Sequence, residues 1–309
     1  MRILVSGATG LVGSALVSAL ERSHPVVRLT RRPPRGPLDL RWDPEAGILD
    51  RGALEGLDAV VHLAGESIGA RRWSAAHKRR VRDSRVGGTR LLCEALASVA
   101  RPPRVMVSAS GVGYYGDRGD QVLDEQSGPG EGFLARVAVE WEGATEAAEL
   151  RGIRVVRMRN GLVLAARGGA LAPLRALTAL GLGGRLGSGR QWWSWIALDD
   201  LTGAIEHAIA SEALRGAVNA VAPGAVTQLE FARTLARVMR RPALVPTPAF
   251  ALRLALGREM ADELLLASQR VQPRRLLATG YAFRFPALEP ALRAALGRAG
   301  RGGERALRA

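Results

Sequence analysis

A glycine-rich segment near the N-terminus is the part of the sequence whose residue types and spacing most directly suggest chemistry. Residues 7–13 read Gly-Ala-Thr-Gly-Leu-Val-Gly and follow a short apolar run at residues 2–6. Glycine permits a tight turn at Gly7, a close approach of the backbone to a phosphate at Gly10, and close packing of a following helix at Gly13. Free N–H groups at the start of that helix favour a negative charge. The residues that we expect to bind the pyrophosphate of a dinucleotide are Gly7, Thr9, Gly10, Leu11, Val12 and Gly13.

The end of the strand predicted for residues 25–30 indicates which dinucleotide binds. Proteins that bind NAD usually place an acid there, on the ribose 2′-hydroxyl, whereas this chain reads Leu29-Thr30-Arg31-Arg32. A guanidinium can meet a 2′-phosphate with two parallel hydrogen bonds. We therefore predict NADP(H), held in part by Arg31. The alternative is that arginines fall at this place by composition alone.

Three further stretches are placed to meet the same cofactor. The strand predicted for residues 58–63 ends in small residues that leave room for a ribose, and residues 159–162 end a later strand near the nicotinamide. Arg85, at the start of a helix predicted for residues 84–100, is either a phosphate ligand or a solvated member of a basic run. The additional cofactor contacts that we predict are Leu63, Ala64, Gly65, Arg85, Ser108 and Leu162.

Composition excludes several other kinds of chemistry. The chain of 309 residues has 44 lysines and arginines against 29 acids, a net charge of +15, and only one of the 44 is a lysine, Lys78. The single cysteine, Cys93, cannot form an internal disulfide or a cysteine-rich zinc site. The four histidines lack metal-binding spacing, so we predict no metal.

The same composition constrains partners and location. The arginines are spread along the whole chain, and the two densest basic runs, residues 71–90 and 298–309, do not interleave aromatic with basic residues as a single-strand binder would, which argues against a specific nucleic-acid partner. No apolar run is long enough to cross a membrane. We expect a cytoplasmic protein, monomeric or homodimeric, that acts on a small molecule.

Alternating strands and helices must position these residues. Apolar runs typical of strands occupy residues 2–6, 25–30, 38–42, 58–63, 104–108 and 153–159, and helical spacing occupies residues 11–22, 84–100 and 133–150. Repeated β-α units predict an α/β fold with a doubly wound parallel sheet of the Rossmann type. After Val163 the chain becomes glycine-rich, and from Thr227 onward it is predicted to be helical, with a proline-rich break at residues 242–248.

These patterns predict two domains. A dinucleotide-binding Rossmann domain covers residues 1–165, with a return segment at about 190–225. A smaller, mainly helical substrate domain covers residues 166–189 and 226–297. Residues 298–309 have no apolar pattern and are expected to be a disordered basic tail.

Three tryptophans stand close together in the sequence Arg190-Gln-Trp192-Trp193-Ser-Trp195. Exposing so many indole rings is costly, so they form either a pocket wall or a core between domains. Indole faces can stack on a substrate, and an arginine can clamp its charge. The substrate contacts that we predict are Arg190, Trp192, Trp193 and Trp195. Asp199 and Asp200, which follow, are expected to cap the next helix.

Several motifs resemble, in type and order, those of the extended short-chain dehydrogenase/reductase superfamily. They are the glycine turn, His62-Leu63-Ala64-Gly65, Ser84-Arg85-x-x-x-Thr89-Arg90-Leu91-Leu92, and Val107-Ser108-Ala109-Ser110 followed by Tyr115-Gly116. Within that superfamily, the chain is most similar to the "epimerase family" group, which has a helical C-terminal domain and is related to nucleotide-sugar epimerases. The marks of that group are Arg72-Trp73, residues 108–116, Trp141-Glu142, residues 187–196, residues 219–223 and Gln269-Arg270-Val271-x-Pro273. Together they cover roughly residues 1–297.

The resemblance implies a catalytic unit that this sequence lacks. Superfamily enzymes combine a Ser or Thr with Tyr-x-x-x-Lys, in which the tyrosine is the general acid/base and the lysine lowers its pKa. In this chain the equivalent helix has Phe133 at the tyrosine position and Val137 at the lysine position. Lys78, the single lysine, lies elsewhere in the sequence.

In place of the missing tyrosine and lysine, residues that follow the strand predicted for residues 104–108 could serve as the general acid/base. The catalytic candidates are Ser110, Tyr114 and Tyr115, although the tyrosines could instead be a packed aromatic pair and Ser110 a strand-end hydroxyl. We expect an atypical NADP(H)-dependent oxidoreductase or epimerase acting on a small polar substrate such as a sugar nucleotide. The alternative is a noncatalytic NADP(H)-binding sensor or scaffold.

Overall fold

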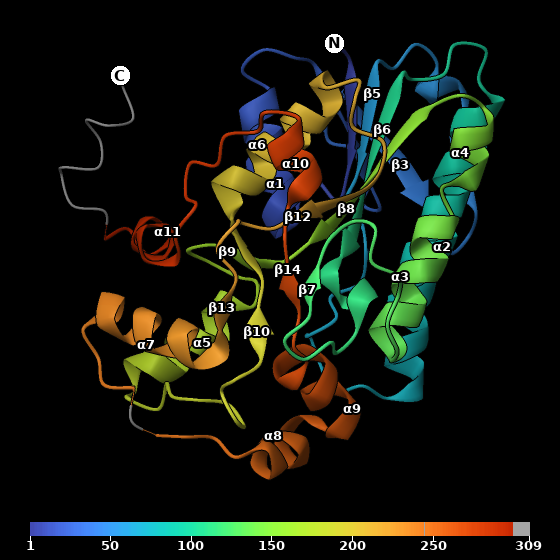
Figure 1. Ribbon diagram of the computed structural model, residues 1–309. Helices are drawn as coiled ribbons and strands as arrows, with labels where there is room; N and C mark the ends of the chain where they lie inside the picture. Colours follow the sequence, from blue (N-terminus) through green and yellow to red (C-terminus); the bar gives the residue numbers. More distant parts are fainter. Residues whose placement is uncertain (244, 299–309) are drawn as a thin grey trace.

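The fold is built around one large sheet (Figure 1), seen in a computed structural model that describes residues 1–243 and 245–298. Neighbouring strands run parallel except for the last pair, β3 and β4, which is antiparallel. The order across the sheet is β12 (Gly216–Ala220), β8 (Arg154–Asn160), β6 (Val105–Gly111), β5 (Ala59–His62), β1 (Ile3–Ser6), β2 (Val26–Thr30), β3 (Asp39–Asp43) and β4 (Ile48–Leu49). The chain therefore proceeds outward in both directions from β1, which confirms the doubly wound α/β prediction.

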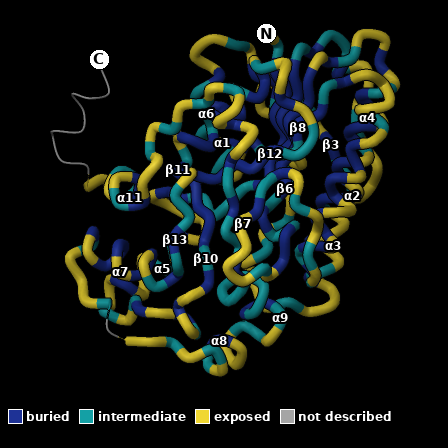
Figure 2. Tube along the Cα trace, viewed as in Figure 1, coloured by how far each residue is buried: buried dark blue, intermediate teal, exposed yellow. Residues whose placement is uncertain are grey.

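Helices cover both faces of the sheet, so the strands are apolar on both sides (Figure 2). Ile3 and Val5 of β1 pack in the core with α1 (Leu11–Leu20) and α6 (Leu198–Ala210). Leu4, which points to the opposite face, packs with α2 (Ala75–Ser98) and α4 (Glu146–Leu150). The helix α3 (Phe133–Gly143) lies beside α2 on that second face (Figure 1).

A second group of elements has its own apolar core, which contains Trp193, Trp195 and Phe231. Three short strand pairs lie outside the large sheet: β9 pairs with β11, β10 with β13, and β7 with β14. The strands outside the large sheet are β7 (Val122–Leu123), β9 (Leu162–Leu164), β10 (Trp192–Trp193), β11 (Trp195–Ala197), β13 (Val226–Thr227) and β14 (Arg270–Val271) in the described chain. The remaining α-helices of the described chain are α5 (Leu171–Ala179), α7 (Gln228–Met239), α8 (Ala249–Leu256), α9 (Arg258–Ala261), α10 (Arg274–Ala278) and α11 (Leu288–Ala295), with a π-helical turn at Asp262–Leu266.

The structure corrects four sequence-based expectations. Helix α2 begins at Ala75 rather than Ser84, because the Ser74 side chain accepts a hydrogen bond from the His77 N–H. The helix expected over residues 133–150 is two helices, α3 and α4. The region after Thr227 is not helical throughout, since residues 270–271 form β14. The expected tail lies outside the described residues from position 299 onward.

The fourth correction concerns Asp199 and Asp200, which do not cap α6. Ala197 occupies the N-cap position of that helix. The buried carboxylate of Asp200 instead accepts hydrogen bonds from the backbone N–H groups of Arg284 (2.6 Å) and Phe285 (3.0 Å). Asp200 therefore fixes a segment of chain more than eighty residues downstream.

Within the described ranges, no helix is both long and apolar enough to cross a membrane. The same ranges hold no group of three or more His, Cys, Asp or Glu side chains that could bind a metal ion.

Candidate functional site

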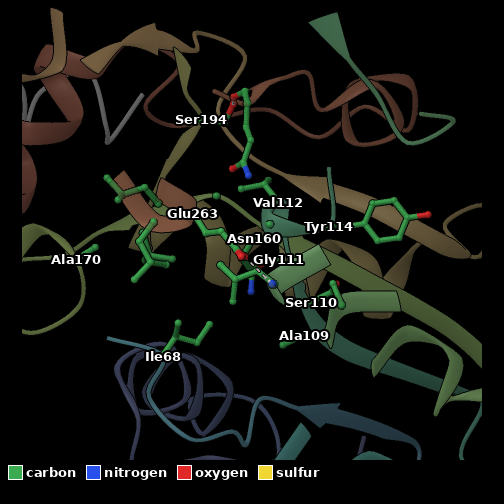
Figure 3. A pocket seen from close by; sticks show the side chains of 18 of the residues that line it. Ile68, Ala109, Ser110, Gly111, Val112, Tyr114, Asn160, Ala170, Ser194 and Glu263 are labelled. Atoms are coloured by element: carbon green, nitrogen blue, oxygen red, sulfur yellow. Dashed lines mark hydrogen bonds between the residues drawn. The ribbon is translucent and has the colours of Figure 1, made fainter. Parts of the chain in front are cut away.

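A cleft of about 520 Å³ opens at the carboxyl ends of β5, β6 and β8, where the strand order reverses around β1. In doubly wound folds this is the place where ligands bind. One wall comes from α3 and the other from β9, β10 and the π-helical turn (Figure 3). Of the residues that we predicted as site residues, those lining the cleft are Leu11, Leu63, Arg85, Ser110, Tyr114, Leu162, Trp192 and Trp193.

The glycine turn between β1 and α1 lies next to this cleft and is as tight as the sequence predicted. Gly7 has φ +69°, and a Cβ on Gly13 would lie 2.1 Å from the Gly7 carbonyl oxygen. No side chain caps the start of α1, so its first N–H groups are available to a bound anion. Thr9, Gly10 and Val12 belong to this turn but not to the lining of the cleft. This arrangement fits a diphosphate.

The end of β5 is held against β1 by a buried serine. Ser6 Oγ lies 2.7 Å from His62 Nδ1 and accepts hydrogen bonds from the N–H groups of Leu63 and Ala64. Burial lowers the pKa of His62 to about 4, so the ring is neutral at ordinary pH. His62 thus positions the strand end and does not face the cleft.

Arg85 lies in the interior of α2 rather than at its start. Its Nη1 donates to the carbonyl oxygens of Glu66 (2.9 Å) and Val81 (3.1 Å), and its guanidinium lies 5.1 Å from the centre of the Trp141 ring. Burial lowers the pKa of Arg85 to about 10, which leaves the group charged at neutral pH. A Cβ on Gly65 would lie 3.2 Å from this guanidinium, so the expected strand-end glycine makes room for it.

Ser110 belongs to a buried ionic network that the sequence did not reveal. Its Oγ donates to Glu142 Oε1 (2.8 Å), and Arg159 holds both oxygens of the same carboxylate at 2.8 Å. Burial lowers the pKa of Arg159, but the hydrogen bonds and charge of Glu142 outweigh burial, so the pKa is raised overall. The Ser110 proton is therefore directed away from the cleft, and its lone pairs are left to accept.

The two adjacent tyrosines have different environments. Tyr114 lines the cleft, and its ring centre lies 3.4 Å from the Arg159 guanidinium carbon. Tyr115 is fully buried; its hydroxyl lies 2.7 Å from Asn219 Oδ1 and accepts from Arg159 Nη1 at 3.0 Å. Burial raises the pKa of Tyr115. The structure therefore argues against Tyr115 as an acid/base, because its hydroxyl is enclosed in protein contacts. Ser108, another cofactor candidate, is also buried beneath the cleft.

The tryptophan segment is divided between the cleft and the core. Trp192 and Trp193 line the cleft, whereas Trp195 is fully buried and donates from Nε1 to the Gly224 carbonyl oxygen (2.8 Å). Arg190 is exposed and lies outside the lining. Trp195 and Arg190 therefore lie outside the lining of the cleft, and the tryptophan segment contributes both to a pocket wall and to a core.

The start of α3 shows what replaces the tyrosine and lysine positions. Phe133 and Val137 pack with Val81 in an apolar cluster. The carboxylate of Glu263 accepts from the N–H groups of Phe133 and Leu134, both at 2.8 Å. Lys78 lies 5.0 Å from the Phe133 ring centre, although it is paired with Glu259 at 2.7 Å and is outside the cleft lining.

Sequence reasoning missed the roles of Glu142, Arg159, Asn160 and Glu263. Trp141-Glu142 was a family mark, and Arg159-Asn160 ended a predicted strand, but nothing in the sequence showed that these pairs meet. Asn160 lines the cleft at the end of β8, and its buried Oδ1 has no hydrogen-bond partner among the residues that the structure describes. An N–H donor on a bound molecule would satisfy it.

Comparison with known proteins identifies the class of protein. The model of the NAD dependent epimerase/dehydratase family matches residues 3–220. A further model, described as a domain of unknown function (DUF1731), matches residues 247–295. The chain therefore belongs to the NAD dependent epimerase/dehydratase family, as the motifs suggested.

Individual relatives match nearly the whole chain. An epimerase family protein of Mycobacterium tuberculosis is 44% identical over 291 residues, 94% of this chain and 96% of the relative. The epimerase family protein SDR39U1 of Homo sapiens is 39% identical over 299 residues, 95% of this chain and 99% of the relative.

Solved structures of epimerase proteins have the same fold as this chain. The crystal structure of human SDR39U1 (isoform2) with NADPH has a TM-score of 0.86 at 36% identity and covers 96% of this chain and 99% of that one. The nucleoside-diphosphate sugar epimerase from Corynebacterium glutamicum has a TM-score of 0.81 at 35% identity and covers 99% of this chain and 61% of that one.

Proposed function

We propose that the protein is an atypical NADP(H)-dependent oxidoreductase, in which hydride passes between the cofactor and a small molecule held in the cleft. The observation that carries this proposal is the position of the cleft. It opens at the strand-order reversal beside an uncapped glycine turn, and Ser110 and Tyr114 line it.

Features of this chain support NADP(H) as the cofactor. The glycine turn fits a diphosphate, and Arg31 follows β2, the strand beside β1, where a 2′-phosphate would lie. The buried Asn160 Oδ1 needs an N–H donor, which the carboxamide of a nicotinamide carries. The human relative was solved with NADPH. When bound, NADPH would supply the hydride.

Two side chains of the cleft, Ser110 and Tyr114, have different proposed roles toward the substrate. Ser110 donates its proton to Glu142, so its oxygen can accept from a ligand and orient it. Tyr114 lines the same cleft, and its hydroxyl has no hydrogen-bond partner within the described part of the chain, so we assign it as the donor for a substrate oxygen. The names of relatives favour a small polar substrate such as a sugar nucleotide.

Titration with the two reduced cofactors tests the cofactor assignment. We expect Arg31→Ala to weaken NADPH binding by about 10- to 100-fold, because a charged hydrogen bond is lost, and to leave NADH binding unchanged. Arg22→Ala, at another exposed arginine, is the control and should change neither affinity. Equal affinities of the unaltered protein for NADPH and NADH would contradict the assignment.

Turnover tests the assignment of the side chains. Tyr114→Phe should lower kcat by about 100-fold, the usual contribution of a positioned proton donor, and Ser110→Ala should also lower it. Neither should change the Kd for NADPH more than about twofold. Tyr281→Phe, which removes a hydroxyl bonded to the Asp200 carbonyl oxygen away from the cleft, should keep full activity.

One observation favours a second candidate, a noncatalytic NADP(H)-binding sensor or scaffold. The positions of the usual tyrosine and lysine are filled by Phe133 and Val137, and Lys78 is engaged by Glu259. Tight NADPH binding without oxidation by any compound of a broad carbonyl panel would favour this candidate over the enzyme.

A further inference from the structure

Few charged side chains line the cleft. Among the described lining residues the only ionic side chains are Arg85 and Glu263. Arg85 donates to two backbone carbonyl groups, and both oxygens of Glu263 accept from the N-terminus of α3. Arg190, the expected charge clamp, is exposed and outside the lining. A sugar nucleotide would bring the charges of a diphosphate into a cleft in which Arg85 is the only cation among the described lining residues.

The walls of the cleft are apolar and partly aromatic. Leu134 and Trp141 of α3 form one side, and Trp192, Trp193 and Leu264 form the other. Figure 3 shows Ile68 and Ala170 on further sides of the same space. Walls of this kind favour a flat apolar molecule over a hydrated sugar, because indole rings contribute stacking faces and exclude water.

The need for a proton donor during reduction also favours a conjugated carbonyl compound over a simple ketone. Reduction of a simple ketone creates an alkoxide, whose conjugate acid is about as weak an acid as water. A strong positioned acid must therefore assist. Reduction of a quinone creates a phenolate-type anion, whose conjugate acid has a pKa near about 10. This product is roughly a million-fold easier to form without an acid. Ser110, whose proton is held by Glu142, and Tyr114 without a lysine suit the second case.

We propose, resting on the proposed NADP(H)-dependent oxidoreductase function, that the substrate is an apolar, planar, conjugated carbonyl compound of the quinone class. This class replaces the sugar nucleotide expected from the resemblance. The quinone gains a hydride, which is two electrons and one proton, and becomes the hydroquinone monoanion, while NADPH becomes NADP⁺. Tyr114 donates a hydrogen bond to the oxygen that gains charge, and water supplies the second proton.

Binding without turnover is the first test. Isothermal titration of the NADP⁺-loaded protein with 2-methyl-1,4-naphthoquinone should show saturable binding, whereas UDP-glucose should show none at millimolar concentration. The Leu264→Gln variant should weaken quinone binding at least tenfold and leave the Kd for NADPH unchanged. Leu277→Gln, at an exposed leucine outside the cleft, should leave both unchanged. Saturable UDP-glucose binding, or equal effects of the two glutamine variants, would overturn the proposal.

Turnover is the second test, and it distinguishes an error in the substrate class from an error in the oxidoreductase function. After subtraction of the uncatalysed rate, kcat/KM for the naphthoquinone should exceed that for cyclohexanone by at least 100-fold. If cyclohexanone or a keto-sugar nucleotide is reduced as well as the quinone, the substrate class is wrong and the oxidoreductase function stands. If NADPH binds and no acceptor is reduced, both are wrong.

Discussion

Glu142 is the residue on which the polar side of the cleft depends. It receives hydrogen bonds from Ser110 and Arg159, and Arg159 in turn contacts Tyr114 and Tyr115. All of these partners are buried or partly buried. The geometry that Ser110 and Tyr114 present to a ligand is therefore fixed by one carboxylate beneath the surface of the cleft.

Neutralising that carboxylate should destabilise the protein strongly. Glu142→Gln keeps the shape but leaves the buried Arg159 guanidinium without a counter-charge, which costs about 3–5 kcal/mol. Urea denaturation measures this loss. The control is Glu140→Gln, which breaks a more exposed pair with Arg82 and should cost less than about 1 kcal/mol. Similar losses for the two variants would show that the network is not what holds this region together.

His62 makes stability depend on pH. In the folded protein burial lowers its pKa from 6.5 to about 4, so the unfolded chain binds a proton that the folded chain excludes. The stabilisation is complete above pH 6.5 and is lost as the pH falls toward 4, by about 3 kcal/mol in all. Denaturation curves between pH 4 and pH 7.5 should show this slope, and the slope should diminish in His62→Gln. An unchanged slope in the variant would contradict the assignment.

The site residues that sequence could predict are those whose function is local. Gly7, Gly10 and Gly13 act through backbone geometry within seven residues, so their spacing was sufficient. Glu142 and Arg159 act as a pair across α3 and β8, and Glu263 reaches the start of α3 from 130 residues away. Periodicity and motif spacing carry no information about such pairings, because they depend on how elements pack.

At the scale of elements, the β1–α1 unit was predicted well and the second half of the chain less well. A strand–turn–helix with glycine at the turn has a strong local signal, whereas the pairing of β14 with β7 joins residues about 150 positions apart. The start of α2 was misplaced because its basic, weakly periodic first turns hid the Ser74 cap.

The turn before α1 gives a prediction at this scale. A Cβ at Gly13 would lie 2.1 Å from the Gly7 carbonyl oxygen, so Gly13→Ala must displace the turn. We expect NADPH affinity to fall more than tenfold and stability to fall as well. Gly87→Ala is a matched control within α2, where a Cβ meets no atom within 4 Å, and it should stabilise the protein by about 0.4–1 kcal/mol. Fluorescence titration and urea denaturation check both expectations, and unchanged NADPH affinity in Gly13→Ala would contradict them.

At the scale of the whole molecule, the cleft exists only because the two halves of the chain are interlocked. Leu276 of α10 is fully buried in the same core as β1, α1 and α6. The Asp200 carboxylate accepts hydrogen bonds from the backbone of Arg284 and Phe285, and β14 pairs with β7. Two sequence-defined domains thus share buried contacts, and a ligand between Trp141 and Trp193 would contact both.

This interlocking predicts that the chain unfolds in a single step although it contains two cores. Trp42 reports on the core of the large sheet, and Trp193 and Trp195 report on the second core. Tryptophan fluorescence and far-ultraviolet circular dichroism should therefore give coincident urea transitions. Leu276→Ala, which opens a cavity where the C-terminal segment meets the large sheet, should cost about 2–5 kcal/mol and shift both transitions equally. Two separated transitions, or a shift of only one, would show instead that the halves are independently stable and that the cleft can open without unfolding either of them.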